Sequence, residues 1–171
     1  DGSRSFCGNG TRSALAWAHA QGALDAKGHE VQIQAVDGPH KGRIRPDGCP
    51  GISMNVAATP VACAPQLEGA HRASFVDTGS PHHVEWLDAA KDVEDLALPQ
   101  AVRPIRYHER YAPEGCNVNV AAQGTTKGHL HIRTFERGVE AETLSCGTGV
   151  VAAALSDMRE EEGPVMERTV H

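Results

Sequence analysis

The sequence lacks the features that mark a membrane-spanning or nucleic-acid-binding protein. Its formal net charge of −6 gives no basic surface for a phosphate backbone, which argues against nucleic acid as a partner. No apolar run approaches the roughly 18 residues of a membrane-spanning helix. Aromatic residues are sparse at 4%, but 40% hydrophobic and 22% charged residues over 171 positions are typical of a globular protein.

The cysteines also lack the patterns of a disulfide framework or a metal site. Their number is odd and none forms a Cys-x-x-Cys pair, so the sequence predicts free thiols and no bound metal. Free thiols indicate a reducing compartment, and we expect a cytoplasmic protein. The five cysteines are Cys7, Cys49, Cys63, Cys116 and Cys146.

Cys146 lies at a junction that predicts chemistry. Apolar and polar residues alternate over 130–135, as in a strand, and 150–155 is small and apolar enough for a buried helix. Between them Cys146 opens a Cys-Gly-Xaa-Gly sequence, where unpaired N–H groups at a helix N-terminus can lower a thiol pKa and bind an anion. A single cysteine here can equally be a buried structural residue.

The same sequence occurs near the start of the chain. Cys7 opens a second Cys-Gly-Xaa-Gly and leads into 13–20, again rich in small apolar residues. A matched pair indicates two copies of one domain, each presenting a helix N-terminus. Two thiols facing one anion site can support a two-base mechanism, in which a thiolate removes a proton from carbon and a thiol returns one to the opposite face.

These two blocks, with Asp77-Thr78-Gly79-Ser80-Pro81-His82-His83-Val84 between them, resemble the diaminopimelate epimerase family. The resemblance runs from Asp1 to about Leu155. It implies a PLP-independent isomerase that needs no cofactor and converts LL- to meso-diaminopimelate for lysine and peptidoglycan precursors. The catalytic pair would be Cys7 and Cys146.

The resemblance also implies a fold. We expect an α+β protein with two similar domains, each with mainly antiparallel strands curled around a central helix, and the active site in the interdomain cleft. The turn-rich stretch 59–66 places the boundary between domains 1–65 and 66–171.

Both ends are expected to be incomplete. Asp1-Gly2-Ser3 is similar to the middle of the family's Asn-Ala-Asp-Gly-Ser motif, and 159–164 would break the last helix before a further strand in 165–171.

The remaining site residues follow from the same resemblance. Backbone N–H groups of Gly8, Asn9, Gly147 and Thr148 would bind the substrate α-carboxylate. Glu136 would hold the α-ammonium group, and Arg137 with Asn117 the distal carboxylate. His82 and Glu136 would tune the thiol pKa values, while Ser80 stands where the family usually has a substrate-binding asparagine. After Glu136 the turn is one residue longer than the commoner Glu-Arg-Gly-Ala-Gly-Glu-Thr form.

Local patterns predict the elements that carry these residues. A loop at 79–81 is expected to continue through His82 and His83 and to leave at least one of them exposed. Segment 109–115 is also expected to be a loop. The predicted strands are 31–35, 41–45, 52–57 and 73–77, a hairpin is expected from 117–122 and 129–135, and a short helix within 88–98.

Two other functions stay open. A proline or hydroxyproline racemase would have a similar fold and cysteine pair, although Glu136-Arg137-Gly138 and Ser80-Pro81-His82 argue against it. A truncated, inactive binding domain would keep the fold without turnover. The expected partner is a small-molecule substrate, and the sequence is compatible with a homodimer.

Overall fold

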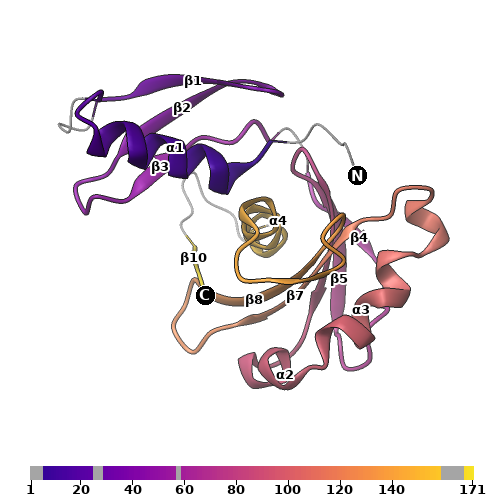
Figure 1. Cartoon of the computed structure of the whole chain (residues 1–171). Helices are drawn as coiled ribbons and strands as arrows, with labels where there is room; N and C mark the ends of the chain where they lie inside the picture. The colour runs from indigo at the N-terminus through magenta and orange to yellow at the C-terminus, as the bar shows by residue number, and fades with distance from the viewer. Residues whose placement is uncertain (1–5, 25–28, 57–58, 159–167) are drawn as a thin grey trace. The chain divides into compact units, whose positions relative to one another are not determined.

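The computed structural model describes residues 6–24, 29–56, 59–158 and 168–171, and the chain divides into two compact units, Asp1–Val56 and Ala57–His171 (Figure 1). The expected α+β class is confirmed: each unit packs a helix against a sheet. The unit boundary lies before the expected one at 65/66. Strand β4, Val61–Cys63, pairs with β5 and therefore belongs to the second unit's sheet.

The first unit is a small antiparallel sheet that carries one helix. Within its described residues the strand order is β1-β2-β3, and α1, Gly8–Ala20, packs against β2 and β3. Buried and exposed residues alternate along β2, where His40 and Ile44 point inward between exposed neighbours. The strands are β1 Val31–Ala35, β2 Gly38–Ile44 and β3 Pro50–Ile52. The strand expected at 52–57 is wrong, because the pairing with β2 begins at Pro50 and ends at Ile52.

The second unit contains a larger sheet of mixed direction. Within the described residues its order is β10-β8-β7-β6-β5-β4. Strand β9 lies outside this order and pairs with the last three residues of β8, 134–136. Pairs β6–β7 and β8–β10 are parallel and the others antiparallel. The remaining strands are β5 Arg72–Asp77, β6 Pro81–Trp86, β7 Asn117–Gln123, β8 His129–Glu136, β9 Ala141–Thr143 and β10 Thr169–Val170.

Helices cover both faces of this sheet, as Figure 1 shows. Helix α4, Gly147–Met158, packs on one face over an apolar cluster that includes Trp86 and Leu130. Helices α2, Ala90–Asp95, and α3, Leu98–Arg106, pack on the other, over Phe135. They form the crossover that a parallel β6–β7 pair requires. The predicted hairpin of β7 and β8 is confirmed, as is the short helix within 88–98.

The predicted loop through His82 and His83 is wrong. Both residues belong to β6, each is 0% exposed, and they point to opposite faces of the sheet. β6 is a central strand between β5 and β7, so its two faces are both buried and its sequence shows no polar–apolar alternation. Helix α3 was not predicted, and the 109–115 loop contains a 3-10 turn, η1, at Glu109–Tyr111.

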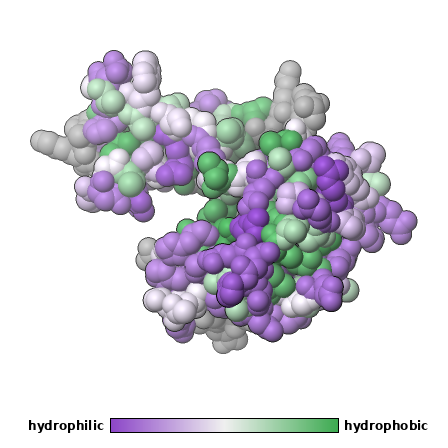
Figure 2. All heavy atoms as spheres, turned by 60° about the horizontal axis from the view of Figure 1, so that its bottom comes forward, coloured by the Kyte–Doolittle hydropathy of each residue, from purple (hydrophilic) through white to green (hydrophobic). Residues whose placement is uncertain are grey.

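The surface is largely hydrophilic, in keeping with the 22% charged residues of the sequence. Hydrophilic side chains cover much of the visible face of each unit in Figure 2. Among the described residues, no helix is both long and apolar enough to cross a membrane. The expected further strand at 165–171 is confirmed for Thr169–Val170. The motif at Asp1-Gly2-Ser3, the helix break at 159–164 and positions 165–167 lie outside the described residues.

Candidate active site

Cys7 caps the N-terminus of α1 with its own side chain. Its backbone is extended, with φ −104° and ψ 93°, while its carbonyl already accepts the first helical hydrogen bond from Thr11 N–H at 3.0 Å. Its sulfur accepts a hydrogen bond from Gly10 N–H at 3.3 Å, where serine or aspartate would ordinarily cap a helix. The thiol is exposed.

Cys146 holds the same position before α4. Its carbonyl accepts a hydrogen bond from Val150 N–H at 2.9 Å, and its sulfur lies 3.4 Å from the Thr148 hydroxyl. Unlike Cys7, it is buried, at 9% exposure. Burial raises the pKa of Cys146, the neighbouring Glu136 raises it further, and hydrogen bonds from Thr148 and Gly149 N–H only partly oppose them. The expectation that the helix N-terminus lowers this pKa is therefore wrong, because burial and Glu136 outweigh the helix.

The spacing Cys-Gly-Xaa-Gly has a steric reason in both units. A Cβ on Gly10 would lie 3.2 Å from the Cys7 sulfur, and one on Gly149 would lie 3.3 Å from the Cys146 sulfur. These separations are tight for a carbon–sulfur contact. The last glycine therefore leaves room for the sulfur over the N–H group of the first helical turn.

Asn117 ties together three segments of the second unit. Its amide oxygen accepts a hydrogen bond from Arg137 N–H at 2.8 Å. Its amide nitrogen donates to the Ser80 hydroxyl at 2.7 Å and to the Pro81 carbonyl at 3.1 Å. Three of the sequence-predicted residues thus meet at one point, and Asn117 holds the loop before β6 against the end of β8.

His82 lies on the α4 face and is neutral at physiological pH. Burial lowers its pKa to about 4, and the charge of Arg137 adds to this. Its Nδ1 lies 2.9 Å from the Asn119 amide nitrogen, which donates to it. The ring proton is therefore on Nε2, a buried group with no hydrogen-bond partner within the described part of the chain.

Asn119 and Thr134 support this site and were not predicted. The Thr134 hydroxyl donates to the Asn119 amide oxygen at 2.9 Å, so the amide nitrogen is left to face His82 and the His83 carbonyl. Asn119 is 0% exposed and lies under the first turn of α4, against Gly149. The signal in the sequence was its spacing of two from Asn117, which puts both amides on one face of β7.

Glu136 and Arg137 lie at the end of β8. Glu136 accepts a hydrogen bond from the Thr143 hydroxyl of β9, and it is also the carboxylate beside the Cys146 thiol. The Arg137 side chain is largely buried, at 13% exposure, and pairs at 3.0 Å with Glu114, whose carboxylate is 78% exposed. An exposed carboxylate is a weak partner that another carboxylate can replace.

The longer turn after Arg137 is held by Glu140, which has a positive φ of 59°. Its carboxylate accepts hydrogen bonds from Arg106 at 2.5 Å, from the Tyr107 hydroxyl and from Gly138 N–H at 3.0 Å. Burial opposes ionisation, but these bonds lower the Glu140 pKa to about 2. They offset the left-handed backbone, which costs a non-glycine residue roughly 1–2 kcal/mol.

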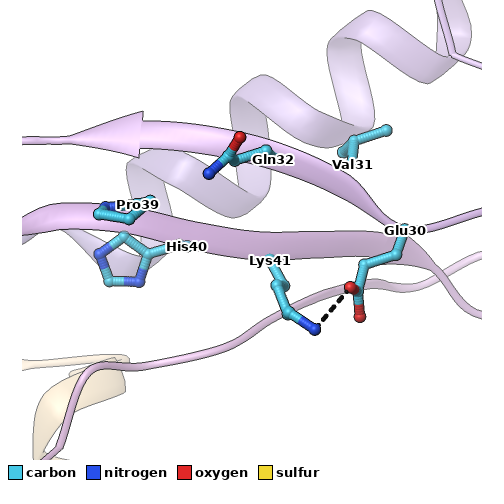
Figure 3. Close-up of a pocket in the computed structure, with 6 residues that line it drawn as sticks. All are labelled: Glu30, Val31, Gln32, Pro39, His40 and Lys41. Atoms are coloured by element: carbon cyan, nitrogen blue, oxygen red, sulfur yellow. Dashed lines mark ion pairs between the residues drawn. The ribbon is translucent and has the colours of Figure 1, made fainter.

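A hollow of 340 Å³ in the first unit contains none of the predicted residues. Figure 3 shows its six lining residues on β1, β2 and the residue before β1, with Glu30 and Lys41 joined by an ion pair of 2.8 Å. Both members of that pair are exposed, and it is worth little. The lining residues are Glu30, Val31, Gln32, Pro39, His40 and Lys41.

The predicted residues thus fall into two groups, one in each unit. Cys7, Gly8 and Asn9 lie at the start of α1. The second group lies in the larger unit and consists of Ser80, His82, Asn117, Glu136, Arg137, Cys146, Gly147 and Thr148. Among the described residues, no group of three or more His, Cys, Asp or Glu side chains is placed to hold a metal.

Comparison with known proteins places the sequence in a family. The family model described as diaminopimelate epimerase matches residues 74–170. Diaminopimelate epimerase from Hydrogenobaculum sp. is 36% identical over 163 residues, covering 91% of this chain and 56% of that protein. The chain spans about half the length of the curated relatives it matches.

Solved structures share the fold at low sequence identity. A phenazine biosynthesis protein of the PhzF family from Bacillus anthracis has a TM-score of 0.60 and 16% identity, with 89% of this chain and 57% of that one covered. A hydroxyproline epimerase from Agrobacterium vitis has a TM-score of 0.54 and 16% identity, with 94% and 55% covered. These likenesses support the fold alone.

Proposed function

Because the chain belongs to the diaminopimelate epimerase family, we propose that the protein is an isomerase that interconverts LL- and meso-diaminopimelate. The observation that carries this proposal is the pair of helices that each begin at a cysteine, Cys7 for α1 and Cys146 for α4. In the proposed mechanism one sulfur removes the α-proton and the other protonates the opposite face of the same carbon.

The two thiols lie in different surroundings, Cys7 exposed and Cys146 buried. Because burial and Glu136 raise the pKa of Cys146, this residue holds its proton and is the acid of the resting site. In the reverse direction it becomes the base, and the adjacent Glu136 carboxylate can then take the thiol proton. Cys7, the exposed cap of α1, has the complementary role.

The first turn of each helix would bind the substrate α-carboxylate. Gly8 and Asn9 begin α1 as Gly147 and Thr148 begin α4, and backbone N–H groups in the first turn of a helix point toward its N-terminal end, where an anion can bind. A helix end stabilises an anion by about 0.3–1 kcal/mol when exposed and up to ~2 kcal/mol when partly buried. Enzymes lower barriers by ~8 kcal/mol or more, so the rest must come from exclusion of water and close positioning of both sulfurs.

His82 would supply a further donor to the developing negative charge. Its Nε2–H is buried and without a partner among the described residues, which costs free energy unless an anion accepts it. Its low pKa, about 4, keeps the ring neutral, so it donates a hydrogen bond without competing for the substrate's proton. A thiolate or the substrate carboxylate can be that acceptor.

The distal end of the substrate would be bound by Arg137. The guanidinium can exchange the exposed Glu114 carboxylate for that of the substrate, while Glu136 holds the α-ammonium group. The hydrogen bonds of Asn117 support a positioning role, because they hold Ser80 and the Arg137 backbone. Ser80, which accepts from Asn117, keeps a hydroxyl proton to donate to a carboxylate.

The proposed chemistry uses side chains and no cofactor. It requires reduced thiols, and this requirement is our reason for proposing a reducing location such as the cytoplasm. The product would serve lysine and peptidoglycan precursor synthesis. We also propose that the protein forms a homodimer, which a measurement of its molecular mass in solution tests.

The direct test is solvent exchange at the α-carbon. The reduced protein, expressed from its complete reading frame, is incubated with LL-diaminopimelate in D₂O, and deuterium incorporation and the meso product are followed by mass spectrometry and chiral chromatography. We expect both, and neither with L-proline under the same conditions. Exchange with L-proline alone would assign the protein to the racemase class instead.

A further inference from the structure

A second cluster of reactive side chains lies on the opposite face of the larger sheet from Cys146. It consists of Cys63 on β4, His83 and Glu85 on β6, and Tyr111 in η1. Because successive residues of a strand point to opposite faces, His82 belongs to the site under α4 and His83 to this cluster. None of these four residues has a part in the proposed epimerase chemistry.

The cluster has the order nucleophile, base, carboxylate. The Cys63 sulfur lies 3.8 Å from His83 Nδ1, and His83 Nε2 lies 2.7 Å from Glu85 Oε1. His83 and Glu85 are both 0% exposed, whereas Cys63 is partly exposed at an edge strand. A carboxylate that orients an imidazole, which in turn faces a thiol, is the arrangement that activates nucleophiles in enzymes.

Glu85 is more than a core residue with satisfied hydrogen bonds. Its Oε1 accepts from His83 and from Gln66 N–H, the latter at 2.7 Å. Its Oε2 is buried and has no partner within the described residues. A buried carboxylate oxygen without a donor is costly, and a cation on the neighbouring imidazole ring compensates for this charge.

The charges around His83 favour that cation. Burial by itself lowers the pKa of His83, but hydrogen bonds to Cys63 and Glu85 and the charges of both groups outweigh it, and the pKa lies above its ordinary value. The other groups near the ring are the Tyr111 hydroxyl, 2.6 Å from Nδ1, and the Cys116 thiol close to Tyr111. Burial raises the pKa of Cys116 to about 12. Tyr111 therefore competes with Cys63 for the same nitrogen.

We propose that Cys63 is a site of covalent modification by small, uncharged electrophiles, with His83 as its base and Glu85 as the residue that orients His83. The reagent class follows from the surroundings. Cys63 is only partly exposed and its neighbours His83 and Glu85 are fully buried, so a small reagent with no charge to desolvate reaches the sulfur most easily.

The step is a simple displacement. The Cys63 thiol proton moves to His83 Nδ1, the sulfur forms a bond to the electrophilic atom, and the leaving group departs with the electron pair. With iodoacetamide the new bond is sulfur–carbon and iodide leaves. With a hydroperoxide the sulfur attacks oxygen, the O–O bond breaks, and hydroxide or alkoxide takes the proton, so that sulfur is oxidised to sulfenic acid and the peroxide is reduced.

Pulse alkylation of the purified protein tests the proposal without any activity assay. Iodoacetamide is added briefly near pH 7, and alkylation of the Cys63 and Cys49 peptides is quantified by mass spectrometry. Cys49 is the internal control because it is more exposed than Cys63. If exposure alone set the alkylation rate, Cys49 would react faster than Cys63. We expect instead that Cys63 reacts about tenfold faster than Cys49, because a positioned base assists it.

Two variants separate base assistance from simple loosening of the core. His83→Gln keeps a similar shape without a base and should bring the Cys63 rate down to that of Cys49 or below it. Tyr111→Phe removes only the competing hydroxyl and should raise the Cys63 rate. Simple loosening of the core would instead raise the Cys63 alkylation rate in both variants. A parent protein in which Cys63 reacts no faster than Cys49, or a His83→Gln variant in which Cys63 keeps its rate, overturns the proposal.

Discussion

Gly149 lies so close to Asn119 that a Cβ on the glycine would be 2.5 Å from the Asn119 amide oxygen. The same Cβ would be 3.2 Å from the Thr134 hydroxyl, the group that donates to this oxygen. The first turn of α4 is thereby held against a buried polar network that reaches His82. Gly149, in the first turn of α4, is therefore a packing requirement of the sheet as well as of the Cys146 sulfur.

Substitution of Gly149 by alanine should therefore be costly. The added methyl group forces α4 away from β7 or breaks the Asn119–Thr134 hydrogen bond, a loss of about 1–3 kcal/mol in unfolding free energy. Denaturant unfolding measures it. Gly8→Ala is the matched control at the start of α1, because its Cβ would make only ordinary contacts of 3.8 Å. Equal stability of both variants would contradict the steric role of Gly149.

The two proposed catalytic thiols should not replace each other. In the protein expressed from its complete reading frame, Cys7→Ser and Cys146→Ser should each lower epimerisation by about 10²–10⁴-fold, since a hydroxyl is a far weaker acid and base than a thiol. Chiral chromatography of the product measures this. A serine variant that epimerises at the parent rate would exclude the paired mechanism.

A substrate analogue with a β leaving group separates the two faces of the carbon, because elimination needs only one base. Each serine variant should retain elimination with the stereoisomer presented to its remaining thiol and lose it with the other. Cys49→Ser is the control and should retain both activities, since Cys49 lies on an exposed turn. Equal elimination of both stereoisomers by one variant would contradict this assignment.

Arg137→Lys should impair recognition of the distal carboxylate. A lysine cannot reproduce the two parallel hydrogen bonds of a guanidinium, and a loss of ~2 kcal/mol corresponds to about thirtyfold in kcat/KM. Steady-state kinetics with diaminopimelate measures the loss. Arg103→Lys, on the exposed side of α3, is the control. Unchanged kcat/KM in Arg137→Lys would remove this residue from the substrate site.

The stability of the first unit should depend on the protonation of His40. This ring is 1% exposed and stacks on Phe6 at 4.1 Å, with Nε2 2.8 Å from the Asp37 carboxylate and Nδ1 2.9 Å from the Ser53 carbonyl. Burial opposes the cation, but the bonds to Asp37 and Ser53 outweigh it and raise the His40 pKa above its ordinary value. Both nitrogens then donate.

The sign of the pH effect follows from this raised pKa. The stabilisation is fully present below the unfolded-state pKa of about 6.5 and is lost as pH rises through the folded-state value. Unfolding midpoints at pH 6 and pH 9 should therefore differ more in the parent than in Asp37→Asn. Asp47→Asn, which alters an exposed carboxylate paired with Arg45, should keep the parental pH dependence. A parental pH dependence in Asp37→Asn would rule out this contribution.

Short-range patterns in the sequence predicted much of this molecule. The two Cys-Gly-Xaa-Gly sequences predicted helices α1 and α4, because an N-terminal cap and the room it needs are set by four consecutive residues. Alternation predicted β1 and β8, and other local patterns predicted β5 and the β7–β8 hairpin, since each of these strands pairs with a neighbour close in sequence. The family resemblance of the segment with Glu136, Arg137 and Cys146 predicts a substrate site at the end of β8, and this stays a prediction.

Only the tertiary structure decided the burial and hydrogen-bond partners of the polar residues on β6 and β7. His82 and His83 were predicted to lie in a loop, and Glu85 and Asn119 were assigned no role, because a polar side chain in a central strand is stable only when distant segments satisfy it. Thr134, His82 and the His83 carbonyl do this for Asn119, and the segments around Tyr111 and Gln66 do it for His83 and Glu85. No local pattern records these partners, because strand pairing and the crossover through α2 and α3 bring them together.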